Sequence, residues 1–72
     1  MDRKTKIESM LLLNNSNIYA INEFRIHADG FEITNNNCVC FYHDILLYEK
    51  EYRLYSLVLH INDIHSIDGI KV

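Results

Sequence analysis

Apolar and polar residues follow a helical period at the start of the chain. Within residues 6–13, the residues that share one stripe of a helix are Ile7, Met10 and Leu11. Thr5 and Glu8 match a capping box, in which both side chains satisfy free backbone N–H groups at a helix start. The Asn- and Ser-rich residues 14–17 then favour a stop, because these side chains compete for backbone hydrogen bonds. The pattern predicts a short N-terminal helix within residues 1–14, with a first strand as the alternative.

From residue 18 the period falls to two, which indicates strands. Apolar and polar residues alternate over residues 24–28 and again over residues 31–34. Asp29-Gly30 stands between these runs, and an Asp-Gly pair is a strong hairpin signal because the favoured turn needs positive φ at both central positions. We therefore expect residues 24–28 and 31–34 to pair as a hairpin. Three asparagines at 35–37 predict the next turn, and residues 38–42 a third strand.

Two segments, VCFYHDILLY and VLHINDIHSI, place apolar residues at the same offsets around an Asp-Ile pair. The alignment superposes Asp44 on Asp63 and Ile45 on Ile64. This spacing fits a strand that bends at one tight turn, where the Asp accepts backbone N–H groups and the Ile enters the core. We expect the same strand, corner and strand to occur twice. The second copy ends in Asp68-Gly69, which predicts a further hairpin with an edge strand.

Residues 45–59 allow two interpretations. Several of their apolar residues recur near helical spacing, and Asp44 could cap a helix there. As strands, residues 46–48 and 52–60 would flank a tip at residues 49–51 that lacks the usual Gly or Asn. The aromatic and aliphatic composition of residues 52–59 favours the strand pair.

These elements predict one α+β, mainly β domain over residues 1–72. A helix in residues 1–14 precedes a β-rich body, residues 18–72, built as a small bent antiparallel sheet or a partly open barrel of about five strands. This arrangement of strand, corner and strand resembles small barrels such as Sm-like or bacterial pleckstrin-homology-like modules, although no family motif is matched residue for residue.

The hydrophobic content is high for so short a chain. Hydrophobic residues make up 49% of 72 residues, whereas a chain of this size buries only about 60% of its unfolded surface. Small domains usually need disulfides, a metal or a partner subunit for stability. We therefore expect some apolar faces to meet another copy of the chain in a homo-oligomer.

The net charge and the positions of the two cysteines reduce the number of possible functions. The formal net charge of −3 gives no cationic field for a phosphate backbone, so nucleic-acid binding is disfavoured. Cys38 and Cys40 lie one residue apart and would close a trivial loop, which indicates reduced thiols and a cytoplasmic protein. The apolar run at residues 10–13 is too short for a signal peptide or a membrane span, so no membrane partner is expected.

Metal and enzyme chemistry are both disfavoured. Cys38, Cys40 and His43 spell C-x-C-x-x-H, but zinc sites need convergent ligands, whereas residues one apart in a strand merely share a face. Adjacent His43 and Asp44 should point apart, and no nucleophile elbow accompanies them. We therefore expect no cofactor, no metal site and no enzymatic activity.

Aromatic and basic residues supply the candidate binding site. Tyr and Arg anchor protein interfaces because they combine large contact area with few rotatable bonds. The candidate binding residues are Arg25, His27, Tyr42, Tyr52, Arg53 and Tyr55. The sequence favours a non-enzymatic, homo-oligomeric protein that binds a protein partner. Its Asn- and Ile-rich, Pro-free composition is the bias of an AT-rich genome, which is common among phages and mobile elements, so an inhibitor or regulator of a host protein is expected. The alternatives are a small barrel that binds single-stranded nucleic acid and a sponge for a small nucleotide.

Overall fold

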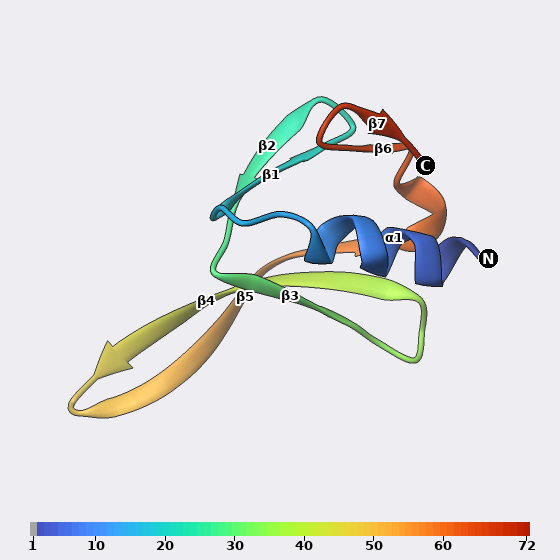
Figure 1. The fold of residues 1–72 in the computed structure, drawn as a ribbon. Helices are drawn as coiled ribbons and strands as arrows, with labels where there is room; N and C mark the ends of the chain where they lie inside the picture. Colours follow the sequence, from blue (N-terminus) through green and yellow to red (C-terminus); the bar gives the residue numbers. More distant parts are fainter. Residues whose placement is uncertain (1) are drawn as a thin grey trace.

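The computed structural model describes residues 2–72 as one helix followed by seven strands in two antiparallel sheets (Figure 1). The elements are α1 (Arg3–Leu12), β1 (Ile18–Ile21), β2 (Phe24–His27), β3 (Gly30–Ile33), β4 (Cys38–Leu47), β5 (Lys50–His60), the 3-10 helix η1 (Ile61–Asp63), β6 (Ser66–Ile67) and β7 (Ile70–Lys71). Sheet A has the order β2-β1-β6-β7 and sheet B the order β3-β4-β5. The predicted α+β, mainly β class is confirmed, as two open sheets and not as a closed barrel.

The N-terminal segment forms the expected helix, but its cap lies elsewhere. Asp2 is the N-cap, and its carboxylate accepts the Thr5 N–H at 2.7 Å. The helix therefore starts at Arg3, and the capping box of Thr5 and Glu8 was wrong. Ile7 and Leu11 are buried, as the helical stripe predicted. Met1, the first residue of the predicted helical segment 1–14, lies outside the described residues.

The predicted hairpin around Asp29-Gly30 was wrong. Strand β2 pairs with β1 across a turn at Asn22 and Glu23, whose φ angles are 50° and 74°. Strand β3 instead belongs to sheet B, so residues 28–29 carry the chain from one sheet to the other. The Asp29 carboxylate accepts the N–H of Asp44 at 2.7 Å, which ties this crossing to β4. An Asp-Gly pair predicts a turn locally, but the common core decides which strands pair.

The repeated phrase forms a corner only in its second copy. There β5 ends in η1, and Ile64 directly after it is fully buried. The His60 imidazole, and not the predicted Asp, accepts a backbone N–H at this corner. In the first copy β4 continues as a strand through Asp44 and Ile45, where β5 pairs with it in unbroken register. The corner at Asp44 was therefore wrong.

The remaining turn and strand predictions are largely confirmed. Residues 45–59 are strands, with the tip at Tyr48 and Glu49 and not at residues 49–51. Both tip residues have positive φ, 50° and 64°. Asp68 and Gly69 form the predicted hairpin turn between β6 and β7. The three asparagines form a turn before β4, which starts at Cys38 as expected and continues to Leu47.

The core lies between α1, sheet A and one end of sheet B. Its buried residues are Ile7, Leu11, Tyr19, Ile21, Ala28, Val39, Phe41, Ile61, Ile64 and Ile67. The other end of β4 and β5 projects beyond this body as a two-stranded arm, residues 42–55 (Figure 1). The radius of gyration is 12.6 Å, against roughly 11 Å for a compact chain of this length. Across residues 2–72, no helix has the length and apolar character needed to cross a membrane.

Candidate interaction surface on the arm

The strand register divides the arm into two faces. Directly opposite residues in an antiparallel pair share a face, and neighbours along a strand alternate between faces. On what we call the outer face, the cross-strand pairs are Tyr42 with Tyr55, Asp44 with Arg53, and Leu46 with Glu51. On the inner face, the pairs are His43 with Leu54, Ile45 with Tyr52, and Leu47 with Lys50. The inner face continues the side of β4 that carries Val39 and Phe41 into the core.

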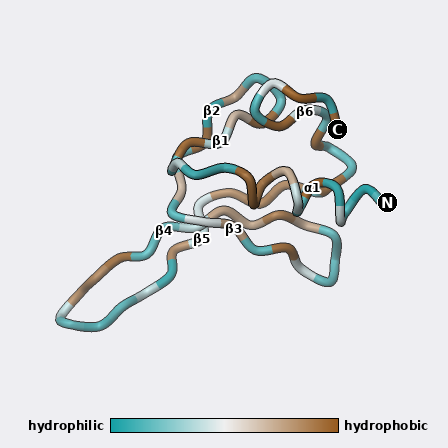
Figure 2. The backbone as a smooth tube through the Cα atoms, viewed as in Figure 1, coloured by the Kyte–Doolittle hydropathy of each residue, from teal (hydrophilic) through white to brown (hydrophobic). Residues whose placement is uncertain are grey.

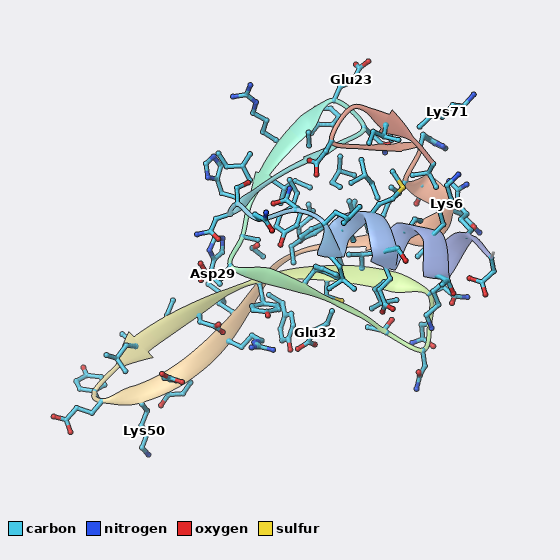
Figure 3. All side chains as sticks on the ribbon, in the orientation of Figure 1. Lys6, Glu23, Asp29, Glu32, Lys50 and Lys71 are labelled. Atoms are coloured by element: carbon cyan, nitrogen blue, oxygen red, sulfur yellow. The ribbon has the colours of Figure 1, made fainter. Side chains whose placement is uncertain are left out.

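The outer face holds a connected group of five side chains at the base of the arm. This Tyr42 cluster consists of Glu32, Tyr42, Asp44, Arg53 and Tyr55. The Arg53 guanidinium donates to Glu32 Oε1 at 2.6 Å and to Asp44 Oδ1 at 3.1 Å, and its Cζ lies 3.8 Å from the centre of the Tyr42 ring. The Tyr55 hydroxyl donates to Glu32 Oε2 at 2.9 Å. Figure 3 shows Glu32 where the arm joins the body.

These contacts fix the cluster, in which the single positive charge of Arg53 is paired with two carboxylates. Hydrogen bonds from Arg53 and Tyr55 lower the pKa of the Glu32 carboxyl, and the same Glu32 bond raises the pKa of the Tyr55 phenol. Glu32 and Asp44 also raise the pKa of Arg53, so this side chain keeps its charge. Arg53, Glu32 and Asp44 all remain about half exposed. The cluster is therefore a preformed, accessible surface of aromatic rings and one paired guanidinium.

The inner face of the arm is mostly apolar, apart from His43 and Lys50, and no other element of the described chain covers it. Leu47 and Leu54 are each about half exposed, at 50% and 54%, and Tyr52 is exposed to a similar extent. Figure 2 shows a hydrophobic stretch along the arm between the body and a hydrophilic tip. Since β5 is also the edge strand of sheet B, both this face and this edge are open to a partner.

An apolar groove opens in the body where the arm begins. It has a volume of about 310 Å³ and lies between β1, β2 and β5. Its lining residues are Ile21, Asn22, Phe24, Ile26, Leu57, Leu59 and Asp63. Leu57 and Leu59 pair with Phe41 and Val39, which places them on the inner face of β5. The groove and the inner face of the arm therefore form one continuous surface.

The structure brings together three of the six predicted binding residues. Tyr42, Arg53 and Tyr55 meet in the cluster, whereas Tyr52 lies on the inner face. Arg25 and His27 lie on β2, an edge strand of the other sheet. Sequence reasoning missed Glu32 and Asp44, which position Arg53. The cross-strand register of the β4–β5 hairpin could have indicated Asp44, which lies opposite Arg53. Glu32 gave no such signal, because it comes from β3.

The cysteine and histidine motif does not converge. Cys38 and Cys40 are free and half-buried, and burial raises the pKa of the Cys40 thiol, which disfavours a reactive thiolate. His43 lies on the opposite face of β4 and approaches Asp29 at 3.9 Å. Within residues 2–72 no group of three or more His, Cys, Asp or Glu side chains is placed to hold a metal ion.

Comparison with known proteins adds no family. No family model, curated protein or solved structure matches the chain. A functional argument therefore depends on the arm, the groove and the Tyr42 cluster themselves.

Proposed function

We propose that this protein is a non-enzymatic binding protein that acts as a homo-oligomer and contacts a protein partner through the Tyr42 cluster. The observation that carries the proposal is the preformed arrangement of Tyr42, Arg53 and Tyr55 on an exposed strand pair. Residues already held in their bound geometry lose little entropy on association. Tyr and Arg are also the residue types that contribute most at protein interfaces.

The charge of the cluster favours protein over nucleic acid. Arg53 is paired with two carboxylates, Glu32 and Asp44, so a phosphate would have to displace at least one of them. The other predicted cations, Arg25 and His27, belong to sheet A and do not extend this surface. A nucleic-acid surface would need several unpaired cations along one groove.

The second alternative, a nucleotide sponge, is opposed by the lining of another hollow in the surface. This depression of about 650 Å³ lies between α1 and β3. Its aromatic residues, Tyr19, Phe31 and Tyr42, could stack on a base, but its charged residues are the carboxylates Glu8 and Glu32. Carboxylates repel a phosphate, so the depression does not suit a nucleotide.

The remaining parts of the proposal follow from composition and from the uncovered apolar surface. The exposed apolar residues of the arm support self-association. The Asn- and Ile-rich, Pro-free composition is of a kind common among phage and mobile-element proteins, which supports a role as a regulator of a host system. We accordingly place the protein in the cytoplasm, where its two thiols stay reduced, as an inhibitor or regulator of a host protein.

Affinity capture with matched variants tests this function. Tagged wild-type protein, Tyr42→Ala, Arg53→Ala and, as the control, Arg25→Ala would be incubated with a lysate of the organism that encodes the chain. We expect one protein to be retained by wild type and Arg25→Ala and to be reduced at least about 10-fold by each cluster variant. Binding of the purified partner should change little between low and high salt. Capture of RNA with a steep salt dependence, or of a protein indifferent to both cluster variants, would overturn the proposal.

A further inference from the structure

The inner face of the arm and the groove form an apolar strip that the body leaves open. The strip runs from the arm into the body, and its residues are Leu47, Tyr52, Leu54, Leu57, Ile26 and Phe24. A bulge at Ser56 keeps Leu54 and Leu57 on one face, because the register shifts by one residue between Phe41 and Tyr42. Phe24, at the end of the groove, is 74% exposed.

The amount of exposed surface matches what a dimer interface buries. The chain exposes 5260 Å² for a mass of 8.5 kDa, whereas a folded monomer of this mass exposes roughly 4,700 Å². The excess of about 600 Å² approaches the ~800 Å² that each partner contributes to a stable interface. The arm, which carries three of the strip residues, is the part of the chain that projects beyond the compact body (Figure 1).

The shape of the molecule fits a second copy. Helix α1 and sheet A cover the inner side of sheet B only as far as the arm (Figure 1). The inner face of the arm is therefore left open beside the groove of the body, which has a volume of about 310 Å³. Because two packed sheets lie roughly 10 Å apart, the arm of a second copy can pack as a further layer on this face. Its own inner face then receives the first arm.

We infer that two copies pack their arms face to face about a two-fold axis that passes beside Leu54. Leu54 then contacts Leu54 of the second copy, and Tyr52 contacts the second copy's Leu57. Tyr52 lies two residues from Leu54 towards the tip, and Leu57 lies three residues from Leu54 towards the body. The extra residue is the bulge at Ser56, so Tyr52 and Leu57 are at similar distances along the strand from Leu54. A two-fold interface repeats each such contact, as an isologous dimer requires.

Charge at the two ends of the strip agrees with this register. Lys50 is the inner-face cation near the tip of the arm (Figure 3), four residues from Leu54. Leu59 lies five residues from Leu54 in the other direction and lines the groove together with Asp63. Neither Lys50 nor Asp63 forms an ion pair with another residue in the described part of the chain. In the dimer, each Lys50 reaches Asp63 of the other copy.

This inference rests on the homo-oligomeric part of the proposed function and leaves the outer face free. The Tyr42 cluster points away from the strip because its residues belong to the outer face. A dimer therefore presents two copies of the cluster, and partner binding gains from bivalency.

Sedimentation equilibrium of matched leucine variants tests the interface. We expect wild type to sediment at twice 8.5 kDa in the micromolar range, Leu54→Lys to sediment as a monomer, and Leu46→Lys to remain dimeric. Leu46 is the outer-face control, since it is more exposed than Leu54 and lies on the same hairpin. Circular dichroism melts establish that each variant is folded. A monomeric wild type at 100-fold higher concentration, or a dimer lost with Leu46→Lys and kept with Leu54→Lys, would overturn the inference.

A charge exchange tests the register separately. Lys50→Glu and Asp63→Lys should each weaken the dimer at least about 5-fold, and the double variant should recover most of that loss. Single and double variants that match wild type would overturn the Lys50–Asp63 contact and with it the proposed axis. The chain could also prove monomeric and still capture a partner through the Tyr42 cluster. That result would contradict the dimer but not the protein-binding part of the proposed function.

Discussion

The ring of Tyr42 lies across Gly30, its direct partner in the β3–β4 register, with no room for a side chain between them. A Cβ at residue 30 would come within 2.6 Å of Tyr42 Cζ. Gly30 is not among the residues with positive φ, so space and not backbone conformation requires the glycine. The absence of a side chain at residue 30 thus leaves the space that the Tyr42 ring occupies when Arg53 stacks on it.

Gly30→Ala should therefore displace the Tyr42 ring and disrupt the Tyr42 cluster. We expect the free energy of unfolding to fall by about 1 kcal/mol, because the Arg53 and Tyr55 contacts of the ring are lost while the ring can move towards solvent. In NMR spectra, the ring-current shifts of the Arg53 side-chain protons should also disappear. The second effect identifies the cause, since a general loss of stability leaves folded-state shifts unchanged.

Gly69→Ala is the matched control for this substitution. Gly69 has a φ of 83° and nothing within 4 Å of its Cβ direction. Alanine there should cost a similar amount through backbone strain alone and leave the Arg53 shifts intact. Equal Arg53 spectra in Gly30→Ala and wild type would contradict the steric argument.

The stability of the protein should depend on the charge of Glu32 in acid. Hydrogen bonds from Arg53 and Tyr55 lower its folded-state pKa below 4.5. A lowered pKa contributes stability that is present above the unfolded value and is lost as pH falls through the folded value. The urea midpoint of wild type should therefore exceed that of Glu32→Gln at pH 7, and the two should approach each other below pH 4.5.

Glu51→Gln supplies the comparison for this titration. Glu51 lies on the same outer face, opposite Leu46, and makes no ion pair with another residue of the described chain. Its urea midpoint at pH 7 should stay close to that of wild type, because the substitution removes no ion pair. A gap between wild type and Glu32→Gln that persists unchanged at pH 3 would show that the charge of Glu32 is not the cause.

The hydrophobic period and the turn residues were enough to predict those helices, strands and turns in which the local sequence pattern agrees with the final packing. Ile7 and Leu11 are buried because a period of 3.6 places them on one helix face. Asp68-Gly69 forms its turn because the short β6 and β7 have no competing partners beyond β1. The strand pair of residues 45–59 follows from composition, although the tip moved to Tyr48 and Glu49.

Pairing between strands could not be read from local signals. Asp29-Gly30 has strong turn character, yet β2 pairs with β1 because both belong to sheet A and cover the core from the other side. The turn that joins β1 and β2, at Asn22 and Glu23, has no glycine and gave little signal. Its positive φ angles are imposed by the packing of the strands that it connects.

The candidate site was predictable only in part, for the same reason. Once the β4–β5 pair is accepted, alternation brings Tyr42 and Tyr55 to one face and places Tyr52 on the other. Glu32 could not be predicted, because its place depends on β3 pairing with β4 and not with β2. The same pairing separates Arg25 from the cluster.

Ile64 and Ile45 occupy equivalent places in the repeated phrase but should differ in their effect on stability. Ile64 is fully buried after η1, whereas Ile45 lies half-buried on the arm. Ile64→Val should lower the free energy of unfolding by about 1 kcal/mol, and Ile45→Val by much less, because only Ile64 leaves a cavity in the core. Urea unfolding at low protein concentration measures both. Equal losses would mean that both copies of the phrase reach the core.

The tip of the arm should become more stable when its two residues are replaced by residues that adopt positive φ at low cost. Tyr48 and Glu49 both have positive φ, which non-glycine residues adopt at a cost of about 1 kcal/mol each, and Tyr48 is 97% exposed. A two-residue turn of this kind favours Asn-Gly. In the double variant Tyr48→Asn with Glu49→Gly, hydrogen exchange of the Leu47 and Lys50 amides should slow by about 5-fold, since opening the arm then relieves less strain.

Glu23→Gly provides the parallel change at the glycine-free turn between β1 and β2. Its φ of 74° should make this substitution slow exchange in β1 and β2 without affecting the arm. In the double variant at the tip of the arm, the loss of the Tyr48 side chain removes almost no buried surface, because this side chain contacts almost nothing. Faster exchange of the arm amides in the double variant would show that Tyr48 or Glu49 stabilises the arm through contacts made by its own side chain.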